Sequence, residues 1–257
     1  MKPTQEFYDF FQYLFDKFNE NLFDNTLPQC LIVITRKNKT FGYYSSRRWA
    51  NNENTYTDEL AINPLYFNRY PFIEILQTIV HEMCHLWQQH NGNPSQRTYH
   101  NKEWADKMES IGLIPSTTGK KGGKRTGQNM MDYPSDTGAF IMTCIDIIYD
   151  PIIKNLWFDK TRNNPVPFNN EINIDTNSTT FNENKEAMYL LYSIYDANNF
   201  TEADLDTEQD SEEIEESENT ADKKNKVKYT CDCGFNVWGK PDLKILCQEC
   251  NSLYQSV

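Results

Sequence analysis

The sequence predicts a fold that mixes helices and strands, followed by a small module built around cysteines. Residues 4–110 show one amphipathic helical pattern, then about three short strand-like stretches, then two further helices. Four of the seven cysteines cluster between Cys231 and Cys250. Hydrophobic residues make up 38% of the chain, which is enough for a packed core and excludes a wholly disordered protein.

The first predicted element is a helix over residues 4–24, because phenylalanines and leucines from Phe7 to Leu22 recur at three- and four-residue steps. Leu27-Pro28 lies beyond its end. Short runs rich in β-branched and aromatic residues follow. We expect strands over residues 30–35, 39–45 and 55–62.

Two more helices are expected after these strands. Pro71 suits the first position of a helix that runs to Gln89, before the turn residues Asn91-Gly92-Asn93-Pro94. The next helix runs from Asn101 to Ser110 and is followed by Gly112.

The remainder of the chain is divided by composition. Residues 116–128 are rich in glycine and lysine and are expected to form a mobile loop. Residues 201–226 are acidic and then basic, with few apolar residues, which predicts a disordered linker. The predicted domains are residues 1–150, an extension of unknown role over 151–200, the linker over 201–226 and a cysteine module over 227–257.

The negative charge of the protein is mostly local. The net charge is -12, but residues 201–222 hold 11 acidic residues and no lysine or arginine. Outside this segment 26 acidic residues face 25 basic ones, a net charge of -1. The acidic composition therefore does not exclude contact between a local basic patch and a nucleic acid.

The second predicted helix carries a metal-binding pattern, His81-Glu82-Met83-Cys84-His85. At about 100° per residue, His81, Glu82 and His85 share one sector of the helix. Two imidazoles one turn apart can bind one zinc ion, which lowers the pKa of a bound water to about 7, and the Glu82 carboxylate can then accept the proton of that water. Apolar residues occupy the opposite, core-facing side: Phe72, Leu76, Ile79, Met83 and Leu86.

A catalytic zinc ion needs a third protein ligand. His90 lies five residues after His85, so it points away from the ligand face and is expected to be a surface or loop residue. His100, at the start of the next helix, is the preferred candidate. Glu103 and Glu109 remain alternatives, because carboxylates also bind zinc.

The terminal module predicts a second, structural zinc site. Cys231-x-Cys233 and Cys247-x-x-Cys250 form two closely spaced pairs, and four thiolates complete a tetrahedral site. Because a module this small has almost no hydrophobic core, the metal would supply much of its folding free energy. The alternatives are two disulfides or redox-active thiols.

Three groups of basic residues are candidate nucleic-acid contacts. Lys120, Lys121, Lys124 and Arg125 either bind DNA phosphates or are solvated. Arg47-Arg48-Trp49 either lines a groove for a single strand or forms a surface turn with Trp49 packed inward. In the cysteine module Phe235 and Trp238 either stack on bases or cover the metal site, and the nearby lysines are Lys226, Lys228, Lys240 and Lys244.

Residues 6–115 resemble the SprT-like (Spartan-type) metalloprotease family. The resemblance rests on several segments: Leu14–Asn19, Leu22–Pro28, Phe41–Tyr44, Glu59–Pro64, His81–His85 and Tyr99–Trp104. Tyr99 replaces a glycine that is common in the family beside the third ligand. Many SprT-like proteins also end in a zinc ribbon, to which the four cysteines are similar.

The resemblance implies an α+β fold with a small mixed sheet of about three strands packed against zincin-type metal-binding helices. It also implies that His81, His85 and His100 bind zinc and that Glu82 is the general base. Some members of the family cut proteins crosslinked to DNA, often with stimulation by DNA.

We therefore expect a zinc metalloprotease with one catalytic and one structural Zn²⁺. Its expected substrate is protein, including protein that is bound or crosslinked to DNA. The alternative is a non-proteolytic zinc protein that binds nucleic acid or a transcription complex. The isolated cysteines and the absence of a secretory pattern at the N-terminus predict a cytoplasmic protein. A monomer without a membrane segment is expected.

Overall fold

The computed structural model of this protein describes residues 2–96, 99–159, 176–193, 227–239 and 244–256. The chain divides into two compact units, Met1–Asp204 and Leu205–Val257. The predicted acidic linker over 201–226, with Lys226, and also Lys240 lie outside the described residues. Among the helices of the described residues, none is both long and apolar enough to cross a membrane.

The first unit opens with helix α1, Pro3–Phe23, as the three- and four-residue spacing predicts. Its apolar face is buried from Phe10 onward, and it packs against α4, α2 and β1. The helix ends at Asp24, which has a left-handed backbone with φ of 55°. The buried face consists of Phe10, Phe11, Leu14, Phe15, Phe18, Leu22 and Phe23.

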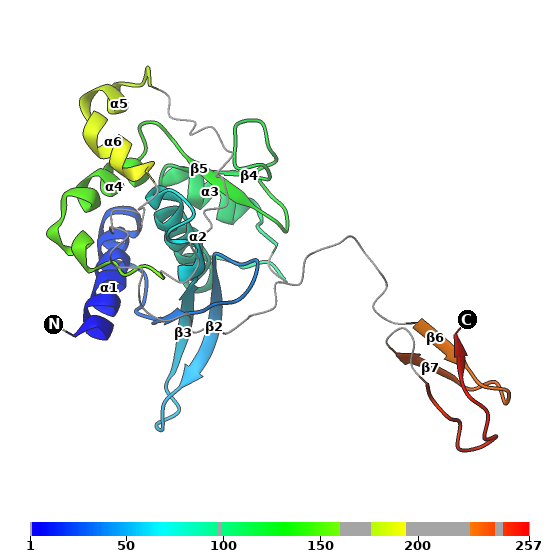
Figure 1. Ribbon diagram of the computed structural model, residues 1–257. Helices are drawn as coiled ribbons and strands as arrows, with labels where there is room; N and C mark the ends of the chain where they lie inside the picture. The colour runs from blue at the N-terminus through cyan, green and yellow to red at the C-terminus, as the bar shows by residue number, and fades with distance from the viewer. Residues whose placement is uncertain (1, 97–98, 160–175, 194–226, 240–243, 257) are drawn as a thin grey trace, which may run out of the picture. The chain divides into compact units, whose positions relative to one another are not determined.

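A three-stranded mixed sheet follows, so the α+β class and the approximate number of strands are confirmed. Strands β1 (Leu31–Ile34), β2 (Gly42–Ala50) and β3 (Tyr56–Ile62) lie in the order β1-β3-β2. β1 pairs with β3 in parallel and β2 pairs with β3 antiparallel. The β2–β3 hairpin projects from the helical part of the unit (Figure 1).

The predicted strand 39–45 begins later and runs further than expected. β2 starts at Gly42 and continues to Ala50, past an irregularity in its pairing between Ser45 and Trp49. Arg47 in this irregularity has a φ of 48°. The extra residues of β2 interrupt the alternation of side chains that marks a strand in a sequence.

Helices α2 (Phe72–Asn91) and α3 (Lys102–Ser110) form beside the sheet, close to the predicted limits. The short 3-10 turn η1, Pro64–Tyr66, connects β3 to α2. The predicted core face of α2 is buried, including Leu76 and Met83, which are 0% exposed. α2 packs against β2, β3 and α3, so it lies at the centre of the unit.

A two-stranded hairpin was not expected from the sequence. β4 (Leu113–Ser116) pairs antiparallel with β5 (Met131–Pro134), on either side of the glycine- and lysine-rich segment. That segment is a loop, but hydrogen bonds organise it: the Thr117 N–H donates to the Lys124 carbonyl, at 2.9 Å, and the Ser116 hydroxyl to the Lys120 carbonyl, at 2.6 Å.

The segments after residue 134 contribute further helices. The apolar run from Phe140 forms α4, Ala139–Tyr149, and the 3-10 turn η2, Pro151–Asn155, follows. In the region predicted as a separate extension, α5 (Thr179–Glu183) and α6 (Lys185–Leu191) place Phe181, Met188 and Leu191 in the same hydrophobic core as α1 and α2.

The second unit contains a small antiparallel sheet. β6 (Val227–Thr230) lies between β7 (Asn236–Gly239) and β8 (Gln255–Ser256). The cysteines lie in the segments that connect these strands. This unit is compatible with a zinc module, as the sequence predicts.

Candidate metal centre

Helix α2 places two histidines and a glutamate on one face, opposite the side that packs into the hydrophobic core. His81 and His85 are one turn apart and partly exposed, whereas Glu82 is 9% exposed. The opposite face of α2 is buried in the core, so the helix cannot rotate without exposing apolar side chains. The core packing therefore determines which way the two imidazoles point.

His100 reaches the same place because of the way α3 begins. Asn101 caps α3, with its Oδ1 accepting from the Trp104 N–H at 3.0 Å. The same oxygen accepts from Nε2 of Gln88 on α2, at 2.7 Å. Gln88 is 2% exposed and also donates to Glu103, at 2.7 Å. These bonds fasten the start of α3 to α2 and bring His100 beside His81 and His85.

The three imidazoles converge on a common point. Nε2 of His100 lies 3.1 Å from Nε2 of His81 and 3.1 Å from Nε2 of His85. Tetrahedral nitrogen ligands at about 2.0–2.1 Å from zinc are about 3.3–3.4 Å apart. The arrangement is therefore compatible with a zinc ion bound by three histidines, and among the described residues no fourth side chain belongs to the cluster.

The protonation of two of these imidazoles also suits a metal. Burial lowers the pKa of His85 well below 6.5, and the nearby His81 and His100 lower it further. Burial, followed by the nearby His81, lowers the pKa of His100 to about 4. Neutral imidazoles have a lone pair available for a metal ion, so neither histidine has to lose a proton at neutral pH.

His81 differs because a carboxylate faces it. Burial acts to lower the pKa of His81, but the hydrogen bond to Asp132 and the charges of Glu82 and Asp132 outweigh it, so the pKa is raised above 6.5. The distance from His81 Nδ1 to Asp132 Oδ2 is 3.0 Å. Asp132 was not predicted from the sequence, because nothing in its spacing from the histidines marks it.

Glu82 lies beside the three imidazoles with a raised pKa. Burial raises the pKa of Glu82, and the nearby His81 and a hydrogen bond from the Tyr44 N–H of β2 counteract this only in part. A carboxylate with a raised pKa is suited to accept a proton and return it near neutral pH.

Gly42 allows β2 to approach Glu82. A Cβ atom at Gly42 would lie 2.8 Å from the Ala61 carbonyl oxygen and 2.8 Å from Cγ2 of Thr78. Such distances are too short for non-bonded atoms, so only glycine lets strand β2 lie this close to α2. Gly42 therefore contributes to the position of the Tyr44 N–H that contacts Glu82.

A cleft of about 940 Å³ opens onto these residues. It is lined by α2, by β2 and by the segment between β4 and β5. His81, Glu82, His85 and His100 all contribute to its surface, and Lys120 belongs to it as well. A molecule that enters the cleft therefore meets the three candidate metal-binding histidines and the glutamate together.

Trp104 packs beneath the three histidines. It is 0% exposed, and its ring centroid lies 4.8 Å from that of His81, 5.4 Å from that of His85 and 4.3 Å from that of His100. The place of Trp104 beneath the three histidines was not predicted, although Trp104 follows His100 by four residues. An aromatic residue one helical turn after a predicted ligand was the available indication.

The other candidate ligands have different partners. His90, in the last turn of α2, has Nε2 2.6 Å from Oδ2 of Asp58. Glu103 accepts hydrogen bonds from Gln88 and from the Asn93 N–H. Glu109 binds Arg125, with 2.8 Å from Nε to Oε1. None of the three belongs to the histidine cluster.

The predicted basic loop lies between β4 and β5. Lys120, Lys121 and Lys124 are exposed. Arg125 differs, because its guanidinium pairs with Asp106 at 2.6 Å and with Glu109 on α3. These ion pairs neutralise much of the charge of Arg125, which was predicted to bind a phosphate. The three lysines are therefore the more available cations of the group.

Arg47-Arg48-Trp49 is part of strand β2 and not a turn after it. The alternative in which Trp49 packs inward is wrong, because its side chain is 44% exposed and its Nε1 donates to Oε2 of Glu59 at 2.6 Å. Arg47 lies 4.5 Å above the ring of Tyr56.

The four cysteines of the second unit form another cluster. Their sulfur atoms all lie within 4.8 Å of one another. Sγ of Cys233 is 3.2 Å from that of Cys231 and 3.7 Å from that of Cys247. These separations exceed the bond of about 2.05 Å in a disulfide. Four thiolates around a tetrahedral zinc ion lie about 3.8 Å apart, so the cluster is compatible with zinc.

The turns after the two cysteine pairs have the backbone that the pairs require. Gly234 has a φ of 86° and Asn251 a φ of 56°. The Gly234 N–H donates to the Cys231 carbonyl and the Asn251 N–H to the Cys247 carbonyl, each at 2.9 Å. The nearby rings of Phe235 and Trp238 are 60% and 63% exposed, so they do not cover the cluster completely.

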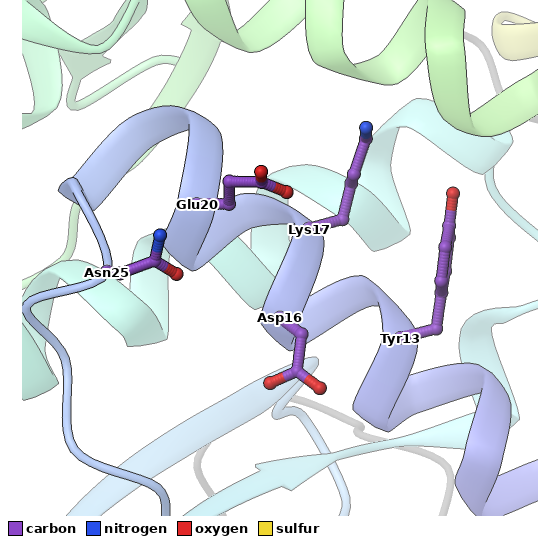
Figure 2. Close-up of a pocket in the computed structure, with 5 residues that line it drawn as sticks. All are labelled: Tyr13, Asp16, Lys17, Glu20 and Asn25. Carbon is purple, nitrogen blue, oxygen red and sulfur yellow. The ribbon is translucent and has the colours of Figure 1, made fainter.

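A second hollow, of about 460 Å³, lies on α1 and shares no lining residue with the histidine cleft. Figure 2 shows Tyr13 and Lys17 extending together from one side of the helix, with Asp16 pointing elsewhere. The Tyr13 hydroxyl donates to Oδ2 of Asp150 at 2.7 Å. This bond ties α1 to the end of α4 and explains the tyrosine as a structural contact.

Comparisons with known proteins agree with this geometry. Residues 11–121 match the SprT-like family. A protein of Salmonella typhimurium, described as an uncharacterized protein in the mucB 3' region, is 49% identical over 59 residues, which are 23% of this chain and 80% of that protein. No solved structure matches the chain significantly.

Proposed function

This chain belongs to the SprT-like family, which suggests an enzyme of the metallopeptidase type, and on that premise we propose that it is a zinc-dependent endopeptidase. The observation that carries the proposal is the convergence of His81, His85 and His100 beside Glu82 in one cleft. A purely structural metal site has no need of a carboxylate next to its open position. The family implies a protein substrate.

The residues present fit zinc as the resident metal. Imidazole nitrogens are preferred zinc ligands, and catalytic zinc sites have three protein ligands and one open position. In the proposal His81, His85 and His100 hold the ion. Zinc, when bound there, lowers the pKa of a water molecule to about 7 and polarises a carbonyl oxygen. The four cysteines hold a second, structural zinc ion.

Glu82 is the general base in this proposal. Its raised pKa lets it take a proton from the attacking water and pass that proton to the nitrogen of the departing amine. The Tyr44 N–H and the buried walls around Glu82 keep the carboxylate oriented toward the cleft. Trp104 and the core face of α2 keep the histidines in place during this transfer.

The cleft also supports a more specific substrate. Lys120 lines it, and Lys121 and Lys124 are exposed on the same loop. Three cations beside a proteolytic site would hold a phosphate backbone next to the bond to be cut. We therefore include in the proposal that the substrate is protein bound or crosslinked to DNA, and that single-stranded DNA stimulates cleavage.

The test compares the wild type with Glu82→Gln, with and without single-stranded DNA. Self-cleavage and cleavage of a DNA-bound protein are scored on gels. Loss of the base is expected to slow cleavage by about 10²–10⁴-fold while the bound zinc stays unchanged. Glu20→Gln removes the same charge at an exposed position of α1 and is the matched control.

Each outcome has a separate meaning. Equal cleavage by the wild type with and without DNA would support the peptidase and contradict stimulation by DNA. If Glu82→Gln cleaves as fast as an active wild type, the assignment of Glu82 as the base is wrong. If both are inert with zinc bound at both sites, the proposed peptidase fails, and the non-proteolytic binding protein becomes the better explanation.

A further inference from the structure

We propose that Asp132 is the positioning residue of the metal centre, and that the β4–β5 hairpin on which it lies orients two of the three histidines. The inference rests on the proposed function, since it concerns the histidine site. It goes beyond that function, because it assigns a role to residues that neither the sequence pattern nor the ligand geometry includes.

The Asp132 carboxylate is held in one orientation. Its side chain is 6% exposed. Oδ2 faces Nδ1 of His81 at 3.0 Å, and Oδ1 accepts from Nε2 of Gln77 at 3.0 Å. Gln77 lies one turn before His81 on α2, is 5% exposed and also donates to the Asp132 carbonyl at 3.2 Å. Both carboxylate oxygens and the backbone of Asp132 are therefore fastened to the helix that carries the ligands.

This contact determines which nitrogen of His81 is available. A carboxylate accepts hydrogen bonds and donates none when ionised, so His81 must carry its proton on Nδ1. Its Nε2 then has a lone pair and points to His100. A carboxylate on the far side of a metal-bound imidazole fixes the tautomer and makes the ring a better ligand.

His100 has the same arrangement with a backbone acceptor. Its Nδ1 lies 3.1 Å from the Gly127 carbonyl oxygen. The main chains of the two residues are also bonded in both directions, with His100 N–H to Gly127 O at 2.8 Å and Gly127 N–H to His100 O at 3.1 Å. The ring of His100 is therefore fixed by the loop between β4 and β5.

Both orienting contacts come from one supersecondary element. Asp132 belongs to β5, where it pairs with Pro115 of β4, and Gly127 precedes β5 in the connecting loop. β4 packs against α3 and β5 against α2. The hairpin thus contacts both helices beside the site. Asp132 and Gly127 also contact Nδ1, the ring nitrogen that faces away from the other histidines, in His81 and His100 respectively. A hairpin needed only for packing would not require a buried carboxylate at this position.

The experiment measures metal affinity directly, with the full chain and with cobalt as the probe. Cobalt held by thiolates absorbs strongly in the near ultraviolet, whereas cobalt held by imidazoles does not, so the two sites are titrated separately in one sample. Asp132→Asn keeps the shape of the side chain and removes its charge, and Asp132→Ala removes the acceptor. Asp136→Asn, four residues further along, changes the same charge without a hydrogen bond to a histidine and is the control.

Asp132→Ala is expected to weaken metal binding at the histidine site by about 10–100-fold, with a smaller loss for Asp132→Asn. The cysteine site and the Asp136→Asn variant should keep the wild-type affinity. At a pH at which the His81 ring is neutral, its ¹⁵N shifts should also show a mixture of tautomers in metal-free Asp132→Ala and only the Nδ1–H form in the metal-free wild type.

Two results would overturn the proposal. One is equal affinity of wild type and Asp132→Ala at the histidine site. The other is weakened binding in Asp132→Ala together with an unchanged His81 tautomer and full recovery in Asp132→Asn, which would indicate packing alone. If Asp132→Ala does not fold, Asp132→Asn and the tautomer measurement decide. If the wild type itself binds no metal at the histidines, the proposed function fails as well, and the two failures remain distinguishable.

Discussion

Single side chains in this protein often connect segments that are distant in the sequence. Asp58 on β3 is an example. Its carboxylate, 5% exposed, accepts hydrogen bonds from the Tyr44 hydroxyl at 2.8 Å and the Arg47 N–H at 2.6 Å, and lies 2.6 Å from Nε2 of His90. It therefore joins β3, β2 and the end of α2 through one buried charge.

The pH dependence of stability should reveal this charge. Burial by itself raises the pKa of Asp58, but the hydrogen bonds from Arg47, His90 and Tyr44 outweigh it and hold the pKa below the ordinary value of 3.8. The stabilisation is therefore fully present above pH 3.8 and is lost as the pH falls through the lower, folded-state pKa. Asp58→Asn should reduce the free energy of unfolding by about 1–3 kcal/mol at pH 6.

Urea unfolding of both proteins between pH 2 and pH 6 checks this. The difference between wild type and Asp58→Asn should shrink below about pH 3.8. Glu53→Gln, at the exposed tip of the β2–β3 hairpin, should show no such change. Parallel curves for wild type and Asp58→Asn would contradict the proton-linked contribution.

At the scale of elements, the distance between strand β2 and helix α2 is the critical quantity. Glu82 comes from the helix, and the N–H that contacts its carboxylate comes from the strand. The two elements can approach because position 42 has no side chain. The Glu82 carboxylate is thus oriented by a contact between elements and not by its own helix.

Gly42→Ala should therefore reduce cleavage more than it reduces stability. The added methyl group must displace β2 from Thr78 and Ala61, which moves the Tyr44 N–H away from Glu82. Since a misplacement of about 1 Å can cost 10²-fold in rate, we expect a loss of about 10–100-fold in kcat. Cleavage assays check this, with Thr57→Ala as the control, because Thr57 lies on the adjacent strand β3 and does not line the cleft. An unchanged kcat in Gly42→Ala would show that the close approach is not needed.

At the scale of the whole molecule, the two units are stabilised by different means. The first unit has an extensive hydrophobic core that includes Phe10, Phe18 and Phe140, each 0% exposed. In the second unit the described residues that are both hydrophobic and buried are Tyr229, Cys231 and Cys247. We therefore expect a module with so little apolar core to need a metal ion at its four cysteines in order to fold.

Removal of zinc should therefore unfold the second unit and leave the first one folded. After treatment with a strong chelator, the NMR signals of β6, β7 and β8 should lose their dispersion, while those of α1 and α4 stay dispersed. Cys247→Ser should have the same effect without a chelator, and Cys144→Ser, which alters a cysteine of the first unit, should leave the module folded. A module that stays folded without metal would contradict the structural zinc site.

Local spacing of residues is sufficient to predict several parts of this protein. The helix with His81 and His85 follows from apolar residues at helical intervals and from two candidate ligands one turn apart. The two cysteine pairs and the sheet of about three strands could be predicted for the same reason. In each case the informative residues lie within a few positions of one another.

Only the tertiary structure decided what surrounds these parts. Asp132 is 51 residues from His81, Gly127 is 27 residues from His100, and the contact between them and the ligands depends on a hairpin of two four-residue strands. Strands this short show no reliable alternation of apolar and polar residues. Because a long loop separates them, their pairing is not evident from the sequence. The periodicity of a sequence describes one element at a time. Packing between elements determines which distant side chains are in contact. The contacts that orient the candidate metal-binding histidines could therefore be identified only from the folded chain.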